Sequence, residues 1–118
     1  MPTRIFSVSY DESLLWTRHM LLRQAGYDVT SVLTFPEALE CCKKGDFDLV
    51  LIGHSIPRED KQALAQEAKM HSKAKILSVL RPTTPPLAEA DYSVKSEDGP
   101  EALLVAVRKA LGETEGQS

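Results

Sequence analysis

The sequence predicts a single α/β domain built around a doubly wound parallel sheet. Short apolar runs alternate with longer amphipathic segments along the 118 residues, which is the pattern of repeated strand–helix units. The run Leu-Val-Leu-Ile at 49–52 contains no polar residue, as expected of a strand that is buried on both faces of a parallel sheet. The length suits one domain, and a composition of 42% hydrophobic and 26% charged residues supports a core without disulfides or metal.

Turn and capping residues divide the chain into five strands and four helices. We expect strands over 4–8, 27–32, 48–52, 75–80 and 91–94, and helices over 11–25, 34–44, 59–70 and 100–111. Ser9 and Glu12 have the spacing of a capping box before the first helix, and Gly26 and Gly45 stand where the first two helices end. Residues 1–112 form the predicted domain, and 113–118 form a polar tail that we expect to be disordered.

Charge and hydropathy exclude several classes of function. The net charge is −3, and the basic pairs 43–44 and 108–109 are short, so direct nucleic-acid binding, which needs clustered cations, is not expected. No run approaches the ~20 apolar residues of a membrane span and no signal peptide is evident, so we expect a cytoplasmic protein. Cys41 and Cys42 are adjacent and point in different directions on a helix, which favours neither a disulfide nor a metal site.

Two short segments are expected to meet at the functional edge of the sheet. In doubly wound sheets, ligands bind at the carboxyl ends of the strands where the strand order reverses. In a five-stranded repeat, this edge holds residues 9–11 (Ser-Tyr-Asp) after the first strand and 53–55 (Gly-His-Ser) after the third. We therefore expect the functional groups of the chain among these residues.

The order and spacing of several motifs resemble one family. The segment LLRQAGYDVTSVLTFPEALECCKKGDFDLVLIGHSIP at 21–57 and the segment ADYSVKS at 90–96 resemble the receiver domains of response regulators, which are CheY-like. The resemblance covers roughly residues 4–111. It implies a flavodoxin-like sheet with strand order 2-1-3-4-5 and a role in a bacterial two-component or phosphorelay pathway.

The residues that receivers use for phosphorylation are almost all missing. Receivers phosphorylate an aspartate at the end of the third strand, aided by an acidic pair that holds Mg²⁺, a hydroxyl and a lysine. Carried over by position, the aspartate falls on Gly53, the acidic pair on Ser9 and Tyr10, and the hydroxyl on Leu80; Lys95 alone matches. The resemblance therefore predicts a pseudo-receiver that is not phosphorylated at the usual position, binds no Mg²⁺ or other cofactor, and is not an enzyme.

Two alternatives stay open at this stage. His54 follows the vacated position and could accept a phosphoryl group, although an ordinary loop histidine is the commoner case. The emptied pocket around Gly53, Leu80 and Lys95 could instead bind a small ligand or ion. Without anionic partners, Lys95 is expected either to be solvated or to pair with Asp11.

A proline-rich segment stands where receivers have their fourth helix. Residues 81–90 contain three prolines, each of which costs about 3 kcal/mol in a helix interior, so at most one turn is expected, near 87–90. The face that receivers use for dimerisation and output must then be rebuilt. We expect an interaction surface there for a protein partner, either a histidine kinase, an output protein or a second copy of the chain, and its candidate residues are Pro85, Pro86, Leu87, Ala102, Val105 and Ala106.

Overall fold

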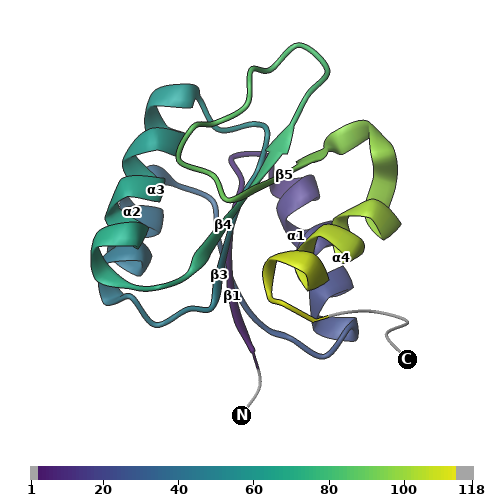
Figure 1. Cartoon of the computed structure of the whole chain (residues 1–118), viewed down its shortest axis with the longest axis horizontal. Helices are drawn as coiled ribbons and strands as arrows, with labels where there is room; N and C mark the ends of the chain where they lie inside the picture. The colour runs from purple at the N-terminus through teal and green to yellow at the C-terminus, as the bar shows by residue number, and fades with distance from the viewer. Residues whose placement is uncertain (1–2, 114–118) are drawn as a thin grey trace.

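A computed structural model, which describes residues 3–113, confirms the predicted sheet. Five parallel strands lie in the order β2-β1-β3-β4-β5 (Figure 1). Their bounds are β1 Arg4–Val8, β2 Asp28–Val32, β3 Leu49–Ile52, β4 Lys75–Leu80 and β5 Tyr92–Lys95. The register pairs Val8 with Ile52 and Leu80 with Lys95, so the strands end together at one edge of the sheet.

Four α-helices cover the two faces of the sheet within the described residues. They are α1 Glu12–Gln24, α2 Phe35–Lys44, α3 Arg58–His71 and α4 Gly99–Ala110, with a short 3₁₀ turn, η1 Ser96–Asp98, before α4. Figure 1 shows α2 and α3 on one face and α1 and α4 on the other. Each face has its own buried cluster, centred on side chains such as Phe6 and Ile52 beside α2 and α3, and Ile5 and Leu77 beside α1 and α4.

The predicted helix stops are confirmed, but the predicted capping box is wrong. Gly26 and Gly45 have the positive φ values, 100° and 64°, that glycine tolerates best. At the start of α1 the cap is Asp11, whose carboxylate accepts a hydrogen bond from the Leu14 amide at 3.1 Å. Ser9 lies two residues too early to cap this helix, because α1 begins only at Glu12.

The connection between β4 and β5 contains no helix, as the prolines predict. It has two tight turns: the Thr84 amide donates to the Arg81 carbonyl at 3.0 Å, and the Ala90 amide donates to the Leu87 carbonyl at 3.1 Å, where one turn was expected. Leu87 is only 4% exposed and belongs to the cluster beside α2 and α3, so its assignment to an interaction surface is wrong. Pro85 and Pro86 are exposed. Leu87 packs on the side of the sheet that α2 and α3 cover, so this leucine does not cover α4.

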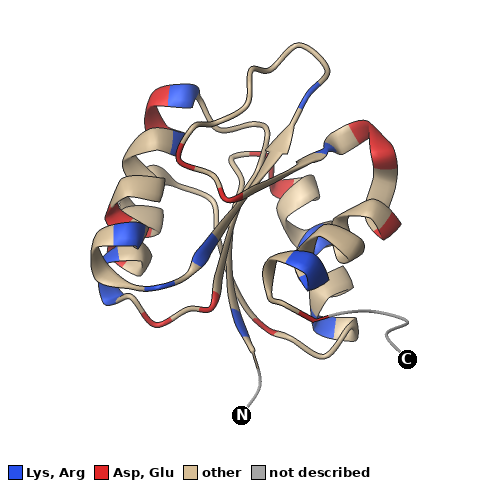
Figure 2. Ribbon diagram, in the orientation of Figure 1, with Lys and Arg blue, Asp and Glu red and all other residues tan. Residues whose placement is uncertain are grey.

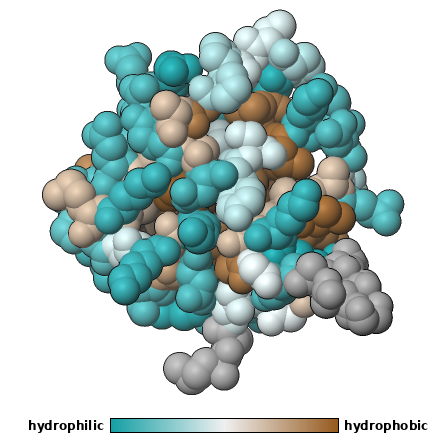
Figure 3. Space-filling view, in the orientation of Figure 1, coloured by the Kyte–Doolittle hydropathy of each residue, from teal (hydrophilic) through white to brown (hydrophobic). Residues whose placement is uncertain are grey.

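Charges of both signs are spread over the chain (Figure 2), and one face of the molecule is mostly polar (Figure 3). Figure 2 shows acidic and basic residues interspersed over the helices, and Figure 3 shows a largely hydrophilic face with hydrophobic side chains visible between the polar ones. In residues 3–113 no helix has the length and apolar character that crossing a membrane requires. Of the predicted tail, Glu113 accepts a hydrogen bond from the Tyr27 hydroxyl at 2.8 Å; residues 114–118 lie outside the described part.

Candidate functional site: the carboxyl edge of the sheet

Gly53 lies in a space that is already filled. It is buried at the end of β3, and its amide donates to the Val8 carbonyl at 2.9 Å. A Cβ atom built on Gly53 would lie 2.8 Å from Nη1 of Arg18, 3.1 Å from the Val8 carbonyl oxygen and 3.2 Å from Cβ of Ser9. The Arg18 guanidinium therefore stands where the side chain of a phosphoacceptor would begin.

The hydroxyl of Ser9 is engaged in a local network. Ser9 is fully buried, and its Oγ lies 3.1 Å from Oγ of Ser55 and accepts from the Asp11 amide at 3.1 Å. The Ser55 hydroxyl also accepts from the Tyr10 amide at 3.0 Å. These bonds join the loop after β1 to the loop after β3, and they occupy the groups that stand at the first acidic position of a receiver.

Tyr10, at the second acidic position, turns towards α3. Its hydroxyl donates to the Asp60 carboxylate at 2.8 Å. Burial, together with this hydrogen bond and the negative charge of Asp60, raises the pKa of Tyr10 above its ordinary value. The phenol is therefore neutral at physiological pH and bound to a carboxylate.

These residues do not fit a magnesium ion. Mg²⁺ is held in proteins mainly by carboxylate oxygens and waters, but Ser9, Tyr10 and Gly53 offer no carboxylate, and the Ser9 hydroxyl is already bonded. The nearby Asp11 carboxylate caps α1. Within residues 3–113, no three His, Cys, Asp or Glu side chains are grouped closely enough to hold a metal ion.

Lys61, on α3, is a site residue that the sequence analysis missed. It is only 3% exposed, and its Nζ donates to Oγ of Ser78 and to the Val79 carbonyl, both at 3.1 Å. Burial, with a smaller contribution from the positive charge of Arg58, lowers the pKa of Lys61 to about 8. A buried ammonium thus joins α3 to β4 under the candidate site.

His54 is held by Arg81 at the rim of the site. Arg81 Nε donates to Nδ1 of His54 at 3.0 Å, an arrangement that requires an unprotonated Nδ1. Burial first, and then the positive charges of Arg18, Arg81 and Lys61, lowers the pKa of His54. The imidazole is therefore neutral at pH 7 in a cationic neighbourhood.

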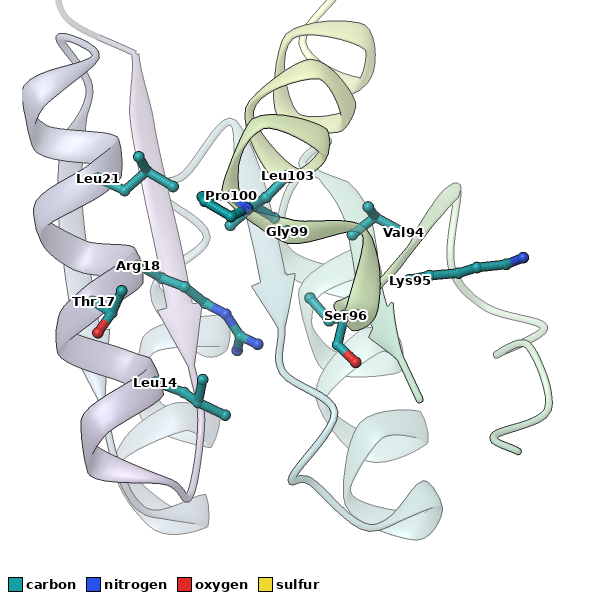
Figure 4. Close-up of a pocket in the computed structure, with 11 residues that line it drawn as sticks. Leu14, Thr17, Arg18, Leu21, Val94, Lys95, Ser96, Gly99, Pro100 and Leu103 are labelled. Carbon is teal, nitrogen blue, oxygen red and sulfur yellow. The ribbon is translucent and has the colours of Figure 1, made fainter. Parts of the chain in front are cut away.

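The remaining predicted positions lie apart from this network. Leu80 is half-buried at the end of β4, and Lys95, its neighbour in the register, is exposed. Figure 4 shows the Lys95 side chain pointing away from Arg18. Of the two alternatives for Lys95, the structure shows the solvated side chain. The charge that Asp11 favours is that of Arg18. Arg18 from α1, rather than Lys95 from β5, lies beside Gly53.

The two missed cations could have been found by their spacing. Arg18 lies three residues after Leu15 and four before Leu22, both of which are buried. Lys61 precedes the buried Leu64 and Ala65 by three and four residues. A charged side chain in an apolar stripe of this period faces the core rather than the solvent, which marks it as unusual.

Comparisons with known proteins establish the fold. No family model and no curated protein matches the sequence. Among solved structures, a CheY-like response regulator receiver domain protein from Methanospirillum hungatei JF-1 is 24% identical, with 96% of each chain covered and a TM-score of 0.80. A response regulator receiver domain protein from Clostridium thermocellum is 15% identical, with 93% of this chain and 94% of that chain covered and a TM-score of 0.81. Chemotaxis protein CheY4 of Vibrio cholerae is 22% identical, with 94% of this chain and 100% of that chain covered and a TM-score of 0.75.

The chain therefore has the fold of response-regulator receivers, the domains of two-component signalling proteins. More particularly, its structural neighbours are CheY-like receiver domains, and its sheet order and flanking helices match theirs. At these identities the likeness concerns the fold, and the chemistry depends on the residues at the carboxyl edge.

Proposed function

We propose that the chain is a pseudo-receiver, which acts in two-component signalling by binding a protein partner and without phosphorylation at the usual position. The observation that carries the proposal is the geometry around Gly53, where the Arg18 guanidinium occupies the space of the missing side chain. A receiver switches because a new phosphoryl group changes the populations of two conformations. Here the position is occupied by a permanent cation, so one conformation is presented to the partner.

The first test is phosphorylation by a small-molecule donor. The purified chain is incubated with acetyl phosphate and Mg²⁺ and examined by intact-mass spectrometry, with an unmodified CheY-like receiver treated in parallel. We expect the control to gain a phosphoryl group and this chain to gain none. A stable gain of one phosphoryl group by this chain would overturn the proposal.

The same phosphorylation assay can be applied to a variant in which an aspartate is restored at position 53. The Gly53→Asp side chain would meet Arg18, whose flexible end can shift, and the two would form an ion pair. Because Ser9 and Tyr10 supply no carboxylate for Mg²⁺, we expect the variant to remain unphosphorylated. Phosphorylation of Gly53→Asp would show that one missing residue, rather than a rebuilt site, separates this chain from an active receiver.

His54 is the second candidate phosphoacceptor, and one observation favours it. Its imidazole is neutral and lies among Arg18, Arg81 and Lys61, whose charges would stabilise an added phosphoryl group. If the wild-type chain gains mass, His54→Ala should abolish the gain and His71→Ala, at the exposed end of α3, should not. Equal labelling of both variants would eliminate His54 as the acceptor.

The partner is expected on the outer face of α4. Val105 is 47% exposed there, and Ala102 and Ala106 are half-buried beside it. Pro85 and Pro86 are also exposed, but on the separate loop between β4 and β5. A photo-crosslinker placed at Val105 should yield a defined adduct with a kinase, an output protein or a second copy, whereas one at the exposed Lys43 on α2 should not. The same adducts from both positions would contradict this assignment.

A further inference from the structure

We propose that the cavity between α1 and α4 is a binding site for a small organic carboxylate, whose anionic group pairs with Arg18 and whose apolar part is about the size of a benzene ring. This inference goes beyond the pseudo-receiver proposal and does not depend on it. It concerns a ligand rather than a phosphoryl group or a protein partner, and it places the ligand on the helix side of Gly53.

The cavity opens at the carboxyl end of the sheet. Its volume is about 170 Å³. Figure 4 shows α1 on one side of it and the β5, η1 and α4 segment on the other, with Arg18 extending from α1 into the space between them. The lining is predominantly apolar and comprises, besides Arg18, mainly Leu14, Leu21, Val79, Val94 and Leu103.

Arg18 is a buried charge that lacks a bonded partner in the described residues. Its side chain lies on the core-facing stripe of α1, and the residue is only 8% exposed. Over residues 3–113, its guanidinium forms no hydrogen bond or ion pair; Asp11 is near enough to favour its charged form, but the Asp11 carboxylate caps α1. Burial lowers the pKa of Arg18, yet arginine stays protonated at physiological pH.

A buried arginine without a bonded partner, such as Arg18, is unusual in a folded protein. A buried charge is costly to desolvate and is normally paired. The planar guanidinium offers a fork of N–H donors that matches a carboxylate in a bidentate arrangement. An entering carboxylate would pair with Arg18 and offset the cost of burying its charge.

The surroundings of the cavity favour a negative ligand. None of the described residues that line it is acidic, and the first turn of α4 contributes Gly99 and Pro100 to its wall. The amino end of a helix carries partial positive charge. Acidic side chains do occur close by in the sequence, at Glu97 and Asp98, but both are exposed and therefore screened by solvent.

The size and lining of the cavity indicate which apolar group the carboxylate ligand would carry. An engineered apolar cavity of about 150 Å³ in another protein binds benzene, so this cavity accommodates an aromatic ring or a short branched alkyl group. Inorganic phosphate would leave the apolar walls uncovered, and a neutral arene would leave Arg18 unpaired. A carboxylate the size of benzoate would cover the apolar walls and also pair with Arg18. Ser96 in the lining supplies a hydroxyl as a further hydrogen-bond donor.

The test uses benzoate as the probe. The full chain, labelled with ¹⁵N, is titrated with benzoate, benzamide, acetate and inorganic phosphate while amide shifts are followed by NMR. We expect saturable shifts with benzoate at the cavity, around Leu14, Val94 and Leu103, and about ten- to a hundredfold weaker binding of benzamide, since a charge-assisted pair is lost. Acetate and phosphate should also bind more weakly than benzoate.

Variants then assign the anion to Arg18. Arg18→Gln should weaken benzoate binding to the level of benzamide, and Arg23→Gln, at an exposed position of the same helix, should leave it unchanged. The comparison of benzoate with benzamide needs no variant, so it holds even if Arg18→Gln unfolds. Equal affinity for benzoate and benzamide, shifts outside the cavity, or no saturation with benzoate would overturn the proposal, and none of these results depends on the phosphorylation assay.

Discussion

The buried ammonium of Lys61 makes a sharp prediction about pH and stability. Its pKa falls from 10.5 to about 8 on folding, so between these values the unfolded chain binds more protons than the folded one. The free energy of unfolding therefore rises with pH in this window. For these two pKa values, the Lys61 contribution amounts to about 2 kcal/mol of added stability between pH 7 and pH 9.5.

The assay is urea unfolding at pH 7 and at pH 9.5, for the wild type and Lys61→Met. Methionine keeps the length and flexibility of the side chain but cannot titrate. Cys42, whose pKa burial raises to about 12, acts in the opposite direction above pH 9, but it is present in both proteins and cancels in the difference. We expect the wild type to gain about 2 kcal/mol more than the variant over this range.

A control on the same helix separates burial from charge. Lys69→Met removes an exposed lysine of α3 and should keep the pH dependence of the wild type. If Lys61→Met and the wild type gain equally with pH, the ammonium is not buried as described, and the reasoning from its contacts with Ser78 and Val79 is refuted.

Two further predictions concern packing and are tested by urea unfolding at constant pH. Gly45→Ala should destabilise the fold by at least about 1 kcal/mol, because the residue has φ 64° and a Cβ would lie 2.1 Å from the His71 carbonyl oxygen. Gly26→Ala, with open space around the residue, should destabilise the fold less. Equal losses of stability for the two variants would contradict the steric argument. Leu87→Ala should lower the free energy of unfolding by about 2–5 kcal/mol, because Leu87 is buried. The control, Val105→Ala, should change it by about 0.5 kcal/mol or less. No loss of stability in Leu87→Ala would show that the loop is not part of the core.

The sequence predicts the elements of the fold closely, because its periodicity is strong. All nine expected strands and helices are present among the described residues, with bounds that differ by about one residue. The start of α1 was misjudged because Ser9 and Asp11 are both good capping residues, and spacing to Glu12 favoured the wrong one. Tertiary contacts decide between them, since Ser9 bonds across to Ser55 instead.

Only part of the candidate site could be predicted from the sequence. The positions of Gly53, Ser9 and Tyr10 follow from the motif order, so the loss of carboxylates could be predicted. Arg18 and Lys61 were missed because a single charge on a helix ordinarily faces water, although both lie within the buried stripes of their helices. Leu87 was assigned to the surface because a lone leucine among prolines has no periodicity that would reveal its burial.

The exposed β5 strand has a consequence for self-association. As an edge strand with four residues, it offers backbone groups to which a strand from another chain could be added. Its shortness and the outward charge of Lys95 are features by which natural sheets discourage such addition. We therefore expect Lys95, which points away from Arg18 (Figure 4), to disfavour the edge-to-edge joining of two copies of the sheet.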